Sequence, residues 1–372
     1  MLKKFAFITL FFASLVLVGC ARSQEVTTSE LPDVIKIGWV GPLTGGLGGV
    51  GQDAKAAVEF YFTEHPMIGG KQVEVIYEDG KCNGADAAAA TQKLITVDGV
   101  QAILGGACSG ETLASAPIAE QNKVVMISSL SSSPEVTTAG DYIFRNYISD
   151  DQVAKTMVNY MLSRNEKIAV LSEQTDFAQG FTHAIVKHME AAGASDKLVL
   201  NESFGVDNTD FRTLLTKVKE AGAGALVSMV QTPVSGGFMA RQAKELGLDI
   251  QIYGTDTLPA PDFFDTAKDA AEGAIAVLAS EDLSRGRFAD FKASIEAPQS
   301  TYAISAFAYD AAEVLARAIE KVGYNGNAIK DYFYTMPTFN GVASDVKFDV
   351  NGDNNIQAAV KVARDGEFVF EK

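Results

Sequence analysis

Three short polar stretches carry residues that could bind a small charged molecule. They span residues 107–112, 128–135 and 254–257, and each follows an apolar run typical of a β-strand. Hydroxyls and free backbone amides at a helix start suit a carboxylate, while an isolated aspartate suits an ammonium group. The same residues could equally be ordinary helix N-caps, so both interpretations stand at this level.

A glycine-rich run at residues 46–51 matches the dinucleotide-binding pattern G-x-G-x-x-G. Such a turn can hold a pyrophosphate at a helix N-terminus. Here the preceding strand is predicted to end at Val40, so the turn is longer than that fingerprint. The acidic candidates Glu78 and Asp79 follow the run by 27 and 28 residues, later than the usual twenty or so. We interpret these glycines as letting the backbone approach a small ligand, and keep an exported nicotinamide- or flavin-dependent oxidoreductase as the alternative.

Motifs for catalysis or metal binding are scarce. The sequence has three histidines, without an H-E-x-x-H pattern, and it has no G-x-S-x-G nucleophile elbow. Residues 349–354 resemble the opening of a calcium loop, but Val360 occupies the twelfth position, where a bidentate glutamate is needed. We therefore expect no enzymatic activity, no cofactor and no metal site.

The elements that would position the polar stretches alternate between strand and helix. Apolar runs at 34–40, 73–77, 102–104 and 124–127 are separated by predicted helices, and a second series begins near Asp150. Strands without strong alternation, each followed by a helix, indicate parallel sheets that are covered on both faces. The pattern predicts an α/β protein with two doubly wound lobes, and a ligand site between them at the carboxyl ends of the strands.

The first twenty residues resemble a lipoprotein export signal. Lys3 and Lys4 precede an apolar run at 5–18, which is shorter than the roughly 20 residues needed to span a bilayer. Small residues before Cys20 resemble a lipobox, in which the chain is cut before the cysteine and its sulfur receives a lipid. An ordinary cleaved signal is the alternative. We expect an extracytoplasmic protein that hangs from a membrane on a flexible tether at 20–32.

Net charge and cysteine content limit the partners and the covalent links that the protein can have. The chain has 47 acidic and 31 basic residues, and its net charge of −16 makes nucleic acid a poor partner. If Cys20 carries a lipid, Cys82 and Cys108 remain in an oxidising compartment. A disulfide is then the default expectation, and two separate buried thiols are the alternative.

Several motifs together resemble the branched-chain amino-acid binding proteins of ABC importers. Their order and spacing follow the family along nearly the whole mature chain. The motifs are Ile37–Gly45, the Cys82 and Cys108 pair, Met126–Ser128 with Ser132–Glu135, Phe144–Arg145, Arg241–Ala243, Tyr253–Asp256 and Phe348–Asp349.

This resemblance implies a type I periplasmic-binding fold, with two lobes joined by three crossovers. By position it implies that Cys82 and Cys108 form a disulfide in the first lobe. The predicted divisions are a signal peptide at 1–19, a lipidated tether at 20–32, a first lobe at 33–148 and 280–336, and a second lobe at 149–279 and 337–372.

The resemblance also assigns ligand-binding roles by position. Ser109 and Ser132 match residues that hold a ligand carboxylate. Asp256 falls where the family has an acidic residue on the α-ammonium group, and the carbonyl of Ser131 would assist it. The remaining predicted ligand-binding residues are Phe177, where several members have tyrosine, Val50, where some have a larger aromatic residue, and Gln231.

The expected function follows from these assignments. The protein would capture an amino acid, most simply an aliphatic or branched-chain one, and deliver it as a monomer to an ABC permease in the membrane. A receptor of the same fold that senses amides or other small solutes is a further alternative.

Overall fold

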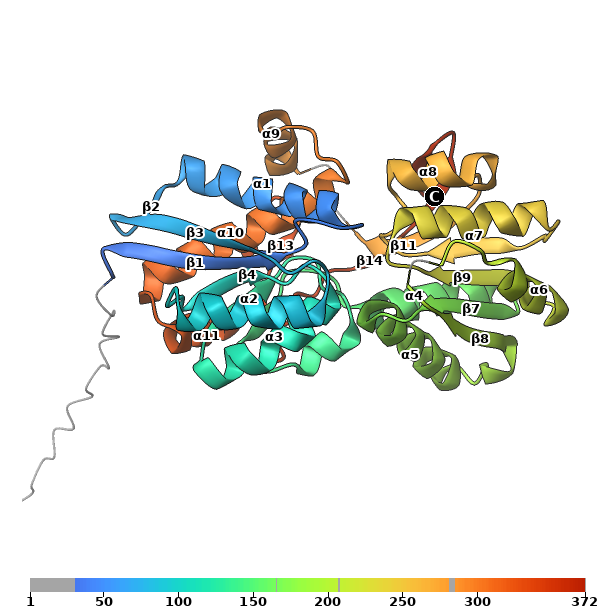
Figure 1. The fold of residues 1–372 in the computed structure, drawn as a ribbon, viewed down its shortest axis with the longest axis horizontal. Coiled ribbons are helices and arrows are strands. Elements are labelled where there is room, and N and C mark those ends of the chain that lie inside the picture. The colour runs from blue at the N-terminus through green and yellow to red at the C-terminus, as the bar shows by residue number, and fades with distance from the viewer. Residues whose placement is uncertain (1–30, 165, 207, 281–284, 372) are drawn as a thin grey trace, which may run out of the picture.

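The structure is a computed structural model that describes residues 31–164, 166–206, 208–280 and 285–371. Its helices and strands form two lobes side by side, each built on a mostly parallel β-sheet with helices on both faces (Figure 1). This arrangement confirms the predicted α/β fold with two doubly wound lobes. The predicted signal peptide, Cys20 and nearly all of the predicted tether lie outside the described residues.

The first lobe contains a six-stranded sheet in the order β2-β3-β1-β4-β5-β6. All neighbouring strands are parallel except β2 and β3, which form a short hairpin. The strands are β1 (Val34–Gly41), β2 (Met67–Ile68), β3 (Lys71–Asp79), β4 (Ala102–Gly105), β5 (Val125–Ser128) and β6 (Ile143–Arg145). The helices are α1 (Gly48–Glu64), α2 (Gly84–Thr96), α3 (Ser109–Asn122), the 3-10 helix η1 (Pro134–Thr138), α9 (Gly286–Ser294), α10 (Tyr302–Val322) and α11 (Gly326–Thr335). Helices α2 and α3 pack together, as do α1 and α10.

The second lobe contains a seven-stranded sheet in the order β15-β14-β11-β10-β9-β7-β8. Strands β14 and β15 are antiparallel to their neighbours, and the other five run parallel. The strands are β7 (Ile168–Glu173), β8 (Leu198–Phe204), β9 (Ala225–Met229), β10 (Gln251–Gly254), β11 (Ile275–Ala279), β14 (Ala358–Arg364) and β15 (Glu367–Phe370). The helices are α4 (Asp150–Ser163), α5 (Asp176–Ala191), η2 (Ser195–Lys197), α6 (Arg212–Glu220), α7 (Pro233–Glu245), α8 (Pro261–Ala267) and η3 (Lys268–Ala270).

The amino-acid composition of the strands explains the layered architecture. Every residue of β5, β9 and β11 is buried, and these strands are apolar or small at nearly every position. Strands with both faces buried need such continuous apolar runs, because helices cover the sheet above and below. No helix within the described residues is both long and apolar enough to cross a membrane.

The chain passes between the lobes three times. It leaves β6 for α4, leaves β11 for α9 through a segment that includes the undescribed residues 281–284, and returns to β14 near the C-terminus. Two of these passages lie side by side, since Arg145 and Asp353 form a parallel β-bridge.

A small ribbon of β12 (Phe339–Asn340) and β13 (Asp345–Val346) precedes the last passage. The carboxylate of Asp310 in α10 accepts hydrogen bonds from the backbone amides of Val342 and Ala343, which fixes this ribbon to the first lobe. The ring of Phe348 also packs on Phe144. The predicted division at residue 337 comes before the ribbon, and we propose that the third crossover begins after Phe348.

Candidate functional site

The loop after β5 folds back onto the loop after β4. The hydroxyl of Ser128 donates to the carbonyl of Gly106 at 2.6 Å and accepts the backbone N–H of Ser131 at 2.9 Å. The hydroxyl of Ser131 lies 3.0 Å from the same carbonyl and 2.7 Å from Thr112 Oγ1. These bonds hold both hydroxyls inside the first lobe. The Ser131 hydroxyl is therefore engaged by the protein itself, and the predicted role of its carbonyl stays a prediction.

Ser109 and Ser132 come together at the start of α3. Both are buried, and the amide of Ser133 donates a 3.1 Å hydrogen bond to Ser109 Oγ. A hydroxyl that accepts from an N–H still has its own proton to donate. The first amides of α3 also lack partners within the helix. The two serines and this helix start form a cluster of donors that could bind a carboxylate, as predicted for them.

The predicted disulfide between Cys82 and Cys108 is confirmed. It joins the turn after β3 to the residue before α3, which carries Ser109. Glu111 supports the same junction, because its carboxylate accepts the backbone amides of Cys82 at 2.9 Å and Cys108 at 3.0 Å. Burial raises the pKa of Glu111 to about 7, against the opposing effect of these hydrogen bonds.

Gln231 extends from the second lobe onto this disulfide. Its Nε2 lies 3.6 Å from Cys108 Sγ and also contacts Cys82 Sγ, while its backbone amide donates to Glu173 at 2.7 Å. The side chain therefore joins the two lobes. Its predicted polar contact with a ligand stays a prediction, because the amide nitrogen is directed at sulfur here.

Asp256 follows β10 and supplies a carboxylate from the second lobe. It is half-buried, and Oδ2 accepts a 2.6 Å hydrogen bond from the hydroxyl of Tyr147, on the first passage between the lobes. Burial raises the pKa of Asp256, and the hydrogen bonds from Tyr147 and Thr255 oppose this shift. A carboxylate in this environment could bind an ammonium group, which is the role predicted for it.

Asp150 is a second carboxylate in this region that sequence reasoning missed. It is only 2% exposed, and its backbone amide donates to the carbonyl of Ser132 at 2.7 Å. Burial raises the pKa of Asp150 well above its usual value, and the nearby charge of Asp256 raises it further. In the sequence, Ser149-Asp150-Asp151 looks like an ordinary capped helix start. Only its position directly after a crossover could have indicated that Asp150 belongs to the site.

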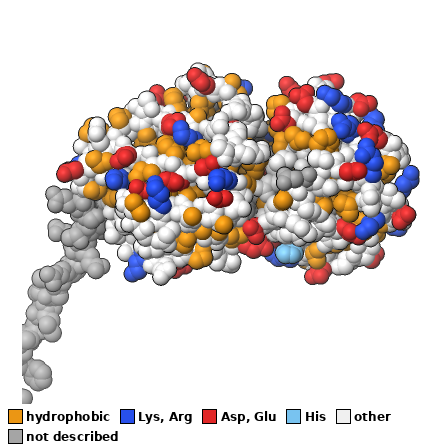
Figure 2. All heavy atoms as spheres, in the orientation of Figure 1, with side chains coloured by type: hydrophobic (Ala, Val, Ile, Leu, Met, Phe, Trp, Pro, Cys, Tyr) orange, Lys and Arg blue, Asp and Glu red, His pale blue; other side chains and the backbone are white. Residues whose placement is uncertain are grey.

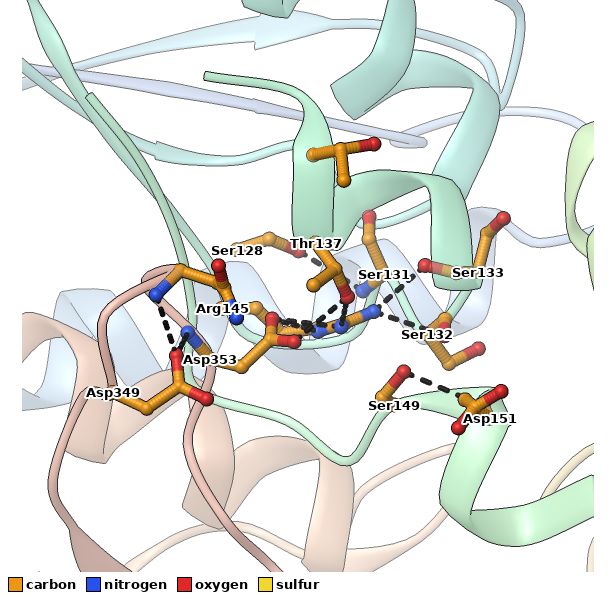
Figure 3. Close-up of polar contacts among 12 residues, drawn as sticks. Ser128, Ser131, Ser132, Ser133, Thr137, Arg145, Ser149, Asp151, Asp349 and Asp353 are labelled. Carbon is orange, nitrogen blue, oxygen red and sulfur yellow. Dashed lines mark hydrogen bonds and ion pairs between the residues drawn. The ribbon is translucent and has the colours of Figure 1, made fainter. Parts of the chain in front are cut away.

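Arg145 connects the serine loop, which is residues 129–133 after β5, to the crossovers, as Figure 3 shows. Its fully buried guanidinium donates through Nη1 to the carbonyls of Ser132 at 3.0 Å and Ser133 at 2.8 Å. Nε and Nη2 donate to Asp353 at 3.0 and 2.7 Å, and Nη2 also donates to Thr137 at 2.8 Å. One side chain thus connects the loop that carries Ser132 to two passages between the lobes.

Phe177 and Val50 lie in different lobes. Phe177 is 8% exposed near the start of α5, and Val50 is half-buried in the first turn of α1. Val50 lies in the glycine-rich run, much of which belongs to α1 itself. Contact of either residue with a ligand stays a prediction.

The geometry of the glycine-rich run does not favour a dinucleotide site. A Cβ atom on Gly51 would collide with the carbonyl oxygen of Pro42, so this glycine permits close packing of helix and loop. Asp79 binds the loop itself, accepting the amide of Leu43 at 2.8 Å and the hydroxyl of Thr44 at 2.6 Å. Asp79 is therefore engaged by the loop, and the other acidic candidate, Glu78, accepts a hydrogen bond from Lys93 at 2.5 Å.

The lobes meet closely around the serine loop and the start of α3. Figure 2 shows the two lobes in contact on one face of the molecule. A Cβ on Gly110 would lie 2.7 Å from Asp176 Oδ2 of the opposite lobe. Glu135 Oε1 lies 3.7 Å from Nδ1 of His183 on α5. Within the described residues no group of three or more His, Cys, Asp and Glu side chains could hold a metal ion.

Comparison with known proteins finds one family along most of the chain. A family model described as periplasmic binding protein matches residues 34–364. The leucine-, isoleucine-, valine-, threonine- and alanine-binding protein of Pseudomonas aeruginosa is 29% identical over 352 residues, which cover 92% of this chain and 91% of that protein. The Leu/Ile/Val-binding protein BraC3 of Rhizobium johnstonii is 27% identical and covers 78% of this chain and 80% of its own.

Solved structures agree with the observed fold. The leucine binding protein LivK of Thermotoga maritima superimposes with a TM-score of 0.82 at 25% identity, covering 91% of this chain and 98% of that one. The branched-chain amino acid transporter substrate binding protein LivJ of Streptococcus pneumoniae, solved in complex with isoleucine, gives a TM-score of 0.78 at 27% identity. It covers 91% of this chain and 100% of its own.

Proposed function

This chain belongs to the periplasmic binding protein family, and from that premise we propose that it is an extracytoplasmic receptor for an aliphatic, most simply branched-chain, amino acid. The observation that carries this proposal is the similarity, over 92% and 78% of this chain, to two proteins named for leucine, isoleucine and valine binding. The receptor would deliver its ligand to an ABC permease in the membrane.

The two ends of an amino acid are matched by opposite lobes. Ser109, Ser132 and the helix start behind them offer hydrogen-bond donors in the first lobe, which suits the ligand carboxylate. Asp256 offers a carboxylate in the second lobe, which suits the ammonium group. A ligand held at both ends would favour the closed arrangement, in which water is excluded and each charged contact is strengthened.

The remaining assignments define the pocket wall. Phe177 is an apolar aromatic side chain, and Val50 is a small aliphatic one. An apolar wall of this kind would favour an aliphatic side chain over a charged one. Gln231 would contact the ligand at the edge of the site where the two lobes come together, and there it already contacts the disulfide. The predicted carbonyl contact of Ser131 would complete the ammonium site.

Anchoring and assembly are part of the same proposal. A lipid on Cys20 would hold the acidic body to a membrane through the tether at 20–32. The body would act as a monomer, and the closed lobes would present a composite surface to the permease. Energy for transport would come from the ATPase of the partner importer.

Isothermal titration calorimetry tests the function directly. The protein would be residues 21–372, which lack Cys20, titrated with each of the twenty amino acids. We expect binding of leucine, isoleucine or valine with a dissociation constant of about 1 µM, or about −8 kcal/mol. Absence of binding to all twenty would refute the amino-acid assignment. Copurification of a nicotinamide or flavin, seen in the absorbance spectrum, would favour the oxidoreductase instead.

A further inference from the structure

Asp150 carries a buried oxygen without a hydrogen-bond partner. The residue is 2% exposed, and Oδ2 accepts no hydrogen bond from any described residue. A buried ionised carboxylate normally accepts several hydrogen bonds or pairs with a cation, because leaving it unpaired is costly. This oxygen is therefore either protonated or reserved for a group that arrives later.

Arg145, a buried cation whose charge acts on Asp150, has its hydrogen-bond donors directed at other groups. Arg145 has five N–H donors, and it directs them at Asp353, Thr137 and the carbonyls of Ser132 and Ser133. The carboxylate of Asp353 balances its charge at 2.7 Å. Arg145 favours the ionised form of Asp150 only through its charge at a distance.

The other charged groups around Asp150 are mostly acidic. Asp256 and Glu135 both disfavour its ionised form, and a hydrogen bond with Ser132 favours it. Helix α4, which Asp150 begins, also packs on α5, β11 and β14. Lys187 and His188 of α5 bind the neighbouring Asp151 at 2.7 and 3.2 Å. Strand β11 has no charged residue. Besides Lys187 and His188, helix α5 carries Asp176, His183 and Glu190, and β14 carries Arg364 and Lys361, whose ammonium lies over the ring of Phe370.

Asp150 lies next to both ends of the proposed ligand site. Its amide binds the carbonyl of Ser132, and it follows by three residues Tyr147, whose hydroxyl binds Asp256. The charge of Asp256 already disfavours ionisation of Asp150, so ionising both carboxylates in this buried region requires a compensating cation. A ligand ammonium group is such a cation.

We propose that Asp150 and Asp256 share one proton in the ligand-free protein, and that binding of an amino-acid ammonium group releases it to solvent. This inference rests on the proposed function and deepens it. The pair changes from one negative charge to two as the ammonium enters with one positive charge. The O–H bond of a carboxylic acid breaks, its electron pair stays on oxygen, and the proton leaves to water or buffer.

Two consequences distinguish this site from one with a permanently ionised acid. Protons compete with the ligand, so affinity falls on acidification by up to about tenfold per pH unit where one proton is released. Ligands that lack an ammonium group do not stabilise the doubly ionised pair. A carboxylic acid of the same shape, such as 4-methylpentanoate in place of leucine, would release no proton.

Calorimetry with leucine in two buffers of different ionisation enthalpy measures the proton count. Between pH 6 and 8 we expect the protein of residues 21–372 to release a fraction of a proton, up to about one, per leucine bound. The variant Asp150→Asn should release less than half of the wild-type amount. The matched control is Asp151→Asn, which alters the adjacent carboxylate bound to Lys187 and should leave the count unchanged.

Difference infrared spectroscopy gives a second readout on the unmodified protein. Leucine should abolish a carbonyl band of a protonated carboxylic acid, and 4-methylpentanoate should not. Leucine binding without proton release between pH 6 and 8, an unchanged infrared band, or an undiminished count in Asp150→Asn would each overturn the proposal. No heat with any amino acid would instead refute the proposed function, and this inference with it.

Discussion

The hydroxyl of Tyr147 donates a 2.6 Å hydrogen bond to the carboxylate of Asp256. Tyr147 lies on the first passage between the lobes and packs on Phe307 of α10, while Asp256 follows β10 of the second sheet. Through this bond, the first passage between the lobes positions the carboxylate that is proposed to bind the ligand ammonium group. Asp256 of the second lobe is thus tied to the first crossover by a direct hydrogen bond.

Replacing Tyr147 with phenylalanine tests this positioning. The variant keeps the ring packed on Phe307 but loses the donor to Asp256. We expect the affinity for leucine to fall about fivefold, which corresponds to a loss of about 1 kcal/mol. The matched control is Tyr160→Phe, which removes a phenol that binds the carboxylate of Glu371 away from the site. Equal affinities in calorimetry for wild type and Tyr147→Phe would contradict the role.

Removing the carboxylate itself should cost more. Asp256→Ala is expected to weaken leucine binding at least about tenfold, because the ligand ammonium loses its charged partner. Asp262→Ala, an acidic residue in the first turn of α8, serves as the control and should leave affinity unchanged. An unaltered dissociation constant for Asp256→Ala would remove this residue from the site.

The fold was predictable because its signals are local. Apolar runs such as the one at 124–127 are visible in the sequence, and β5 formed there as expected. Helix α9 was missed because it is short and buries only Phe288 and Phe291, which leaves a weak pattern. Strand β2 has two residues, too few for any alternation to appear.

The candidate site was predictable only in part, because partners distant in the chain decide it. The family resemblance identified Cys82 and Cys108 as a disulfide, and the structure confirms it. Spacing could not reveal that Arg145 binds Asp353, 208 residues later in the chain. Nor could it show that Asp150 keeps an oxygen unpaired, since that requires knowing where every donor of Arg145 points.

The pair of Arg145 and Asp353 should matter strongly for stability. Asp353→Asn removes the carboxylate that balances a fully buried guanidinium. Breaking a buried pair from one side is expected to lower the free energy of unfolding by about 3 kcal/mol or more. Urea unfolding can be followed through the fluorescence of Trp39, the single tryptophan, which is buried in β1.

The control for that measurement is an exposed ion pair. Glu245→Gln breaks the contact with Arg212 at 3.0 Å, where both side chains are about half exposed. This change should cost less than about 1 kcal/mol. Similar unfolding free energies for the two variants would mean that the buried pair contributes no more than a surface one.

The disulfide should stabilise the first lobe independently. The double variant Cys82→Ser with Cys108→Ser opens a loop between residues 26 apart. Chain entropy predicts a loss of about 3.5 kcal/mol in the free energy of unfolding. A reducing agent should lower the urea midpoint of the wild type to the same value and leave the double variant unchanged. A loss below about 1 kcal/mol would contradict the expectation.

Asp79 gives a pH-dependent prediction with a definite sign. Slight burial opposes ionisation, but hydrogen bonds from the Thr44 hydroxyl and the amides of Leu43 and Lys81 outweigh it and lower the pKa of Asp79. The folded protein therefore binds this proton less tightly than the unfolded chain does. Ionised Asp79 stabilises the folded state at pH values above the unfolded pKa of about 3.8. This stabilisation is lost as the pH falls through the lower pKa that Asp79 has in the folded state.

Asp79→Asn should accordingly lower the free energy of unfolding by about 1 to 2 kcal/mol at pH 7, because the glycine-rich loop loses its charged acceptor. The difference between wild type and variant should shrink as pH falls toward 3, where the wild-type carboxyl begins to protonate. Asp33→Asn is the matched control: Lys71 lowers the pKa of Asp33 too, but that side chain is almost fully exposed, so the variant should unfold like the wild type at both pH values. Urea midpoints that differ equally at pH 7 and pH 3 would show that Asp79 anchors the loop without its charge.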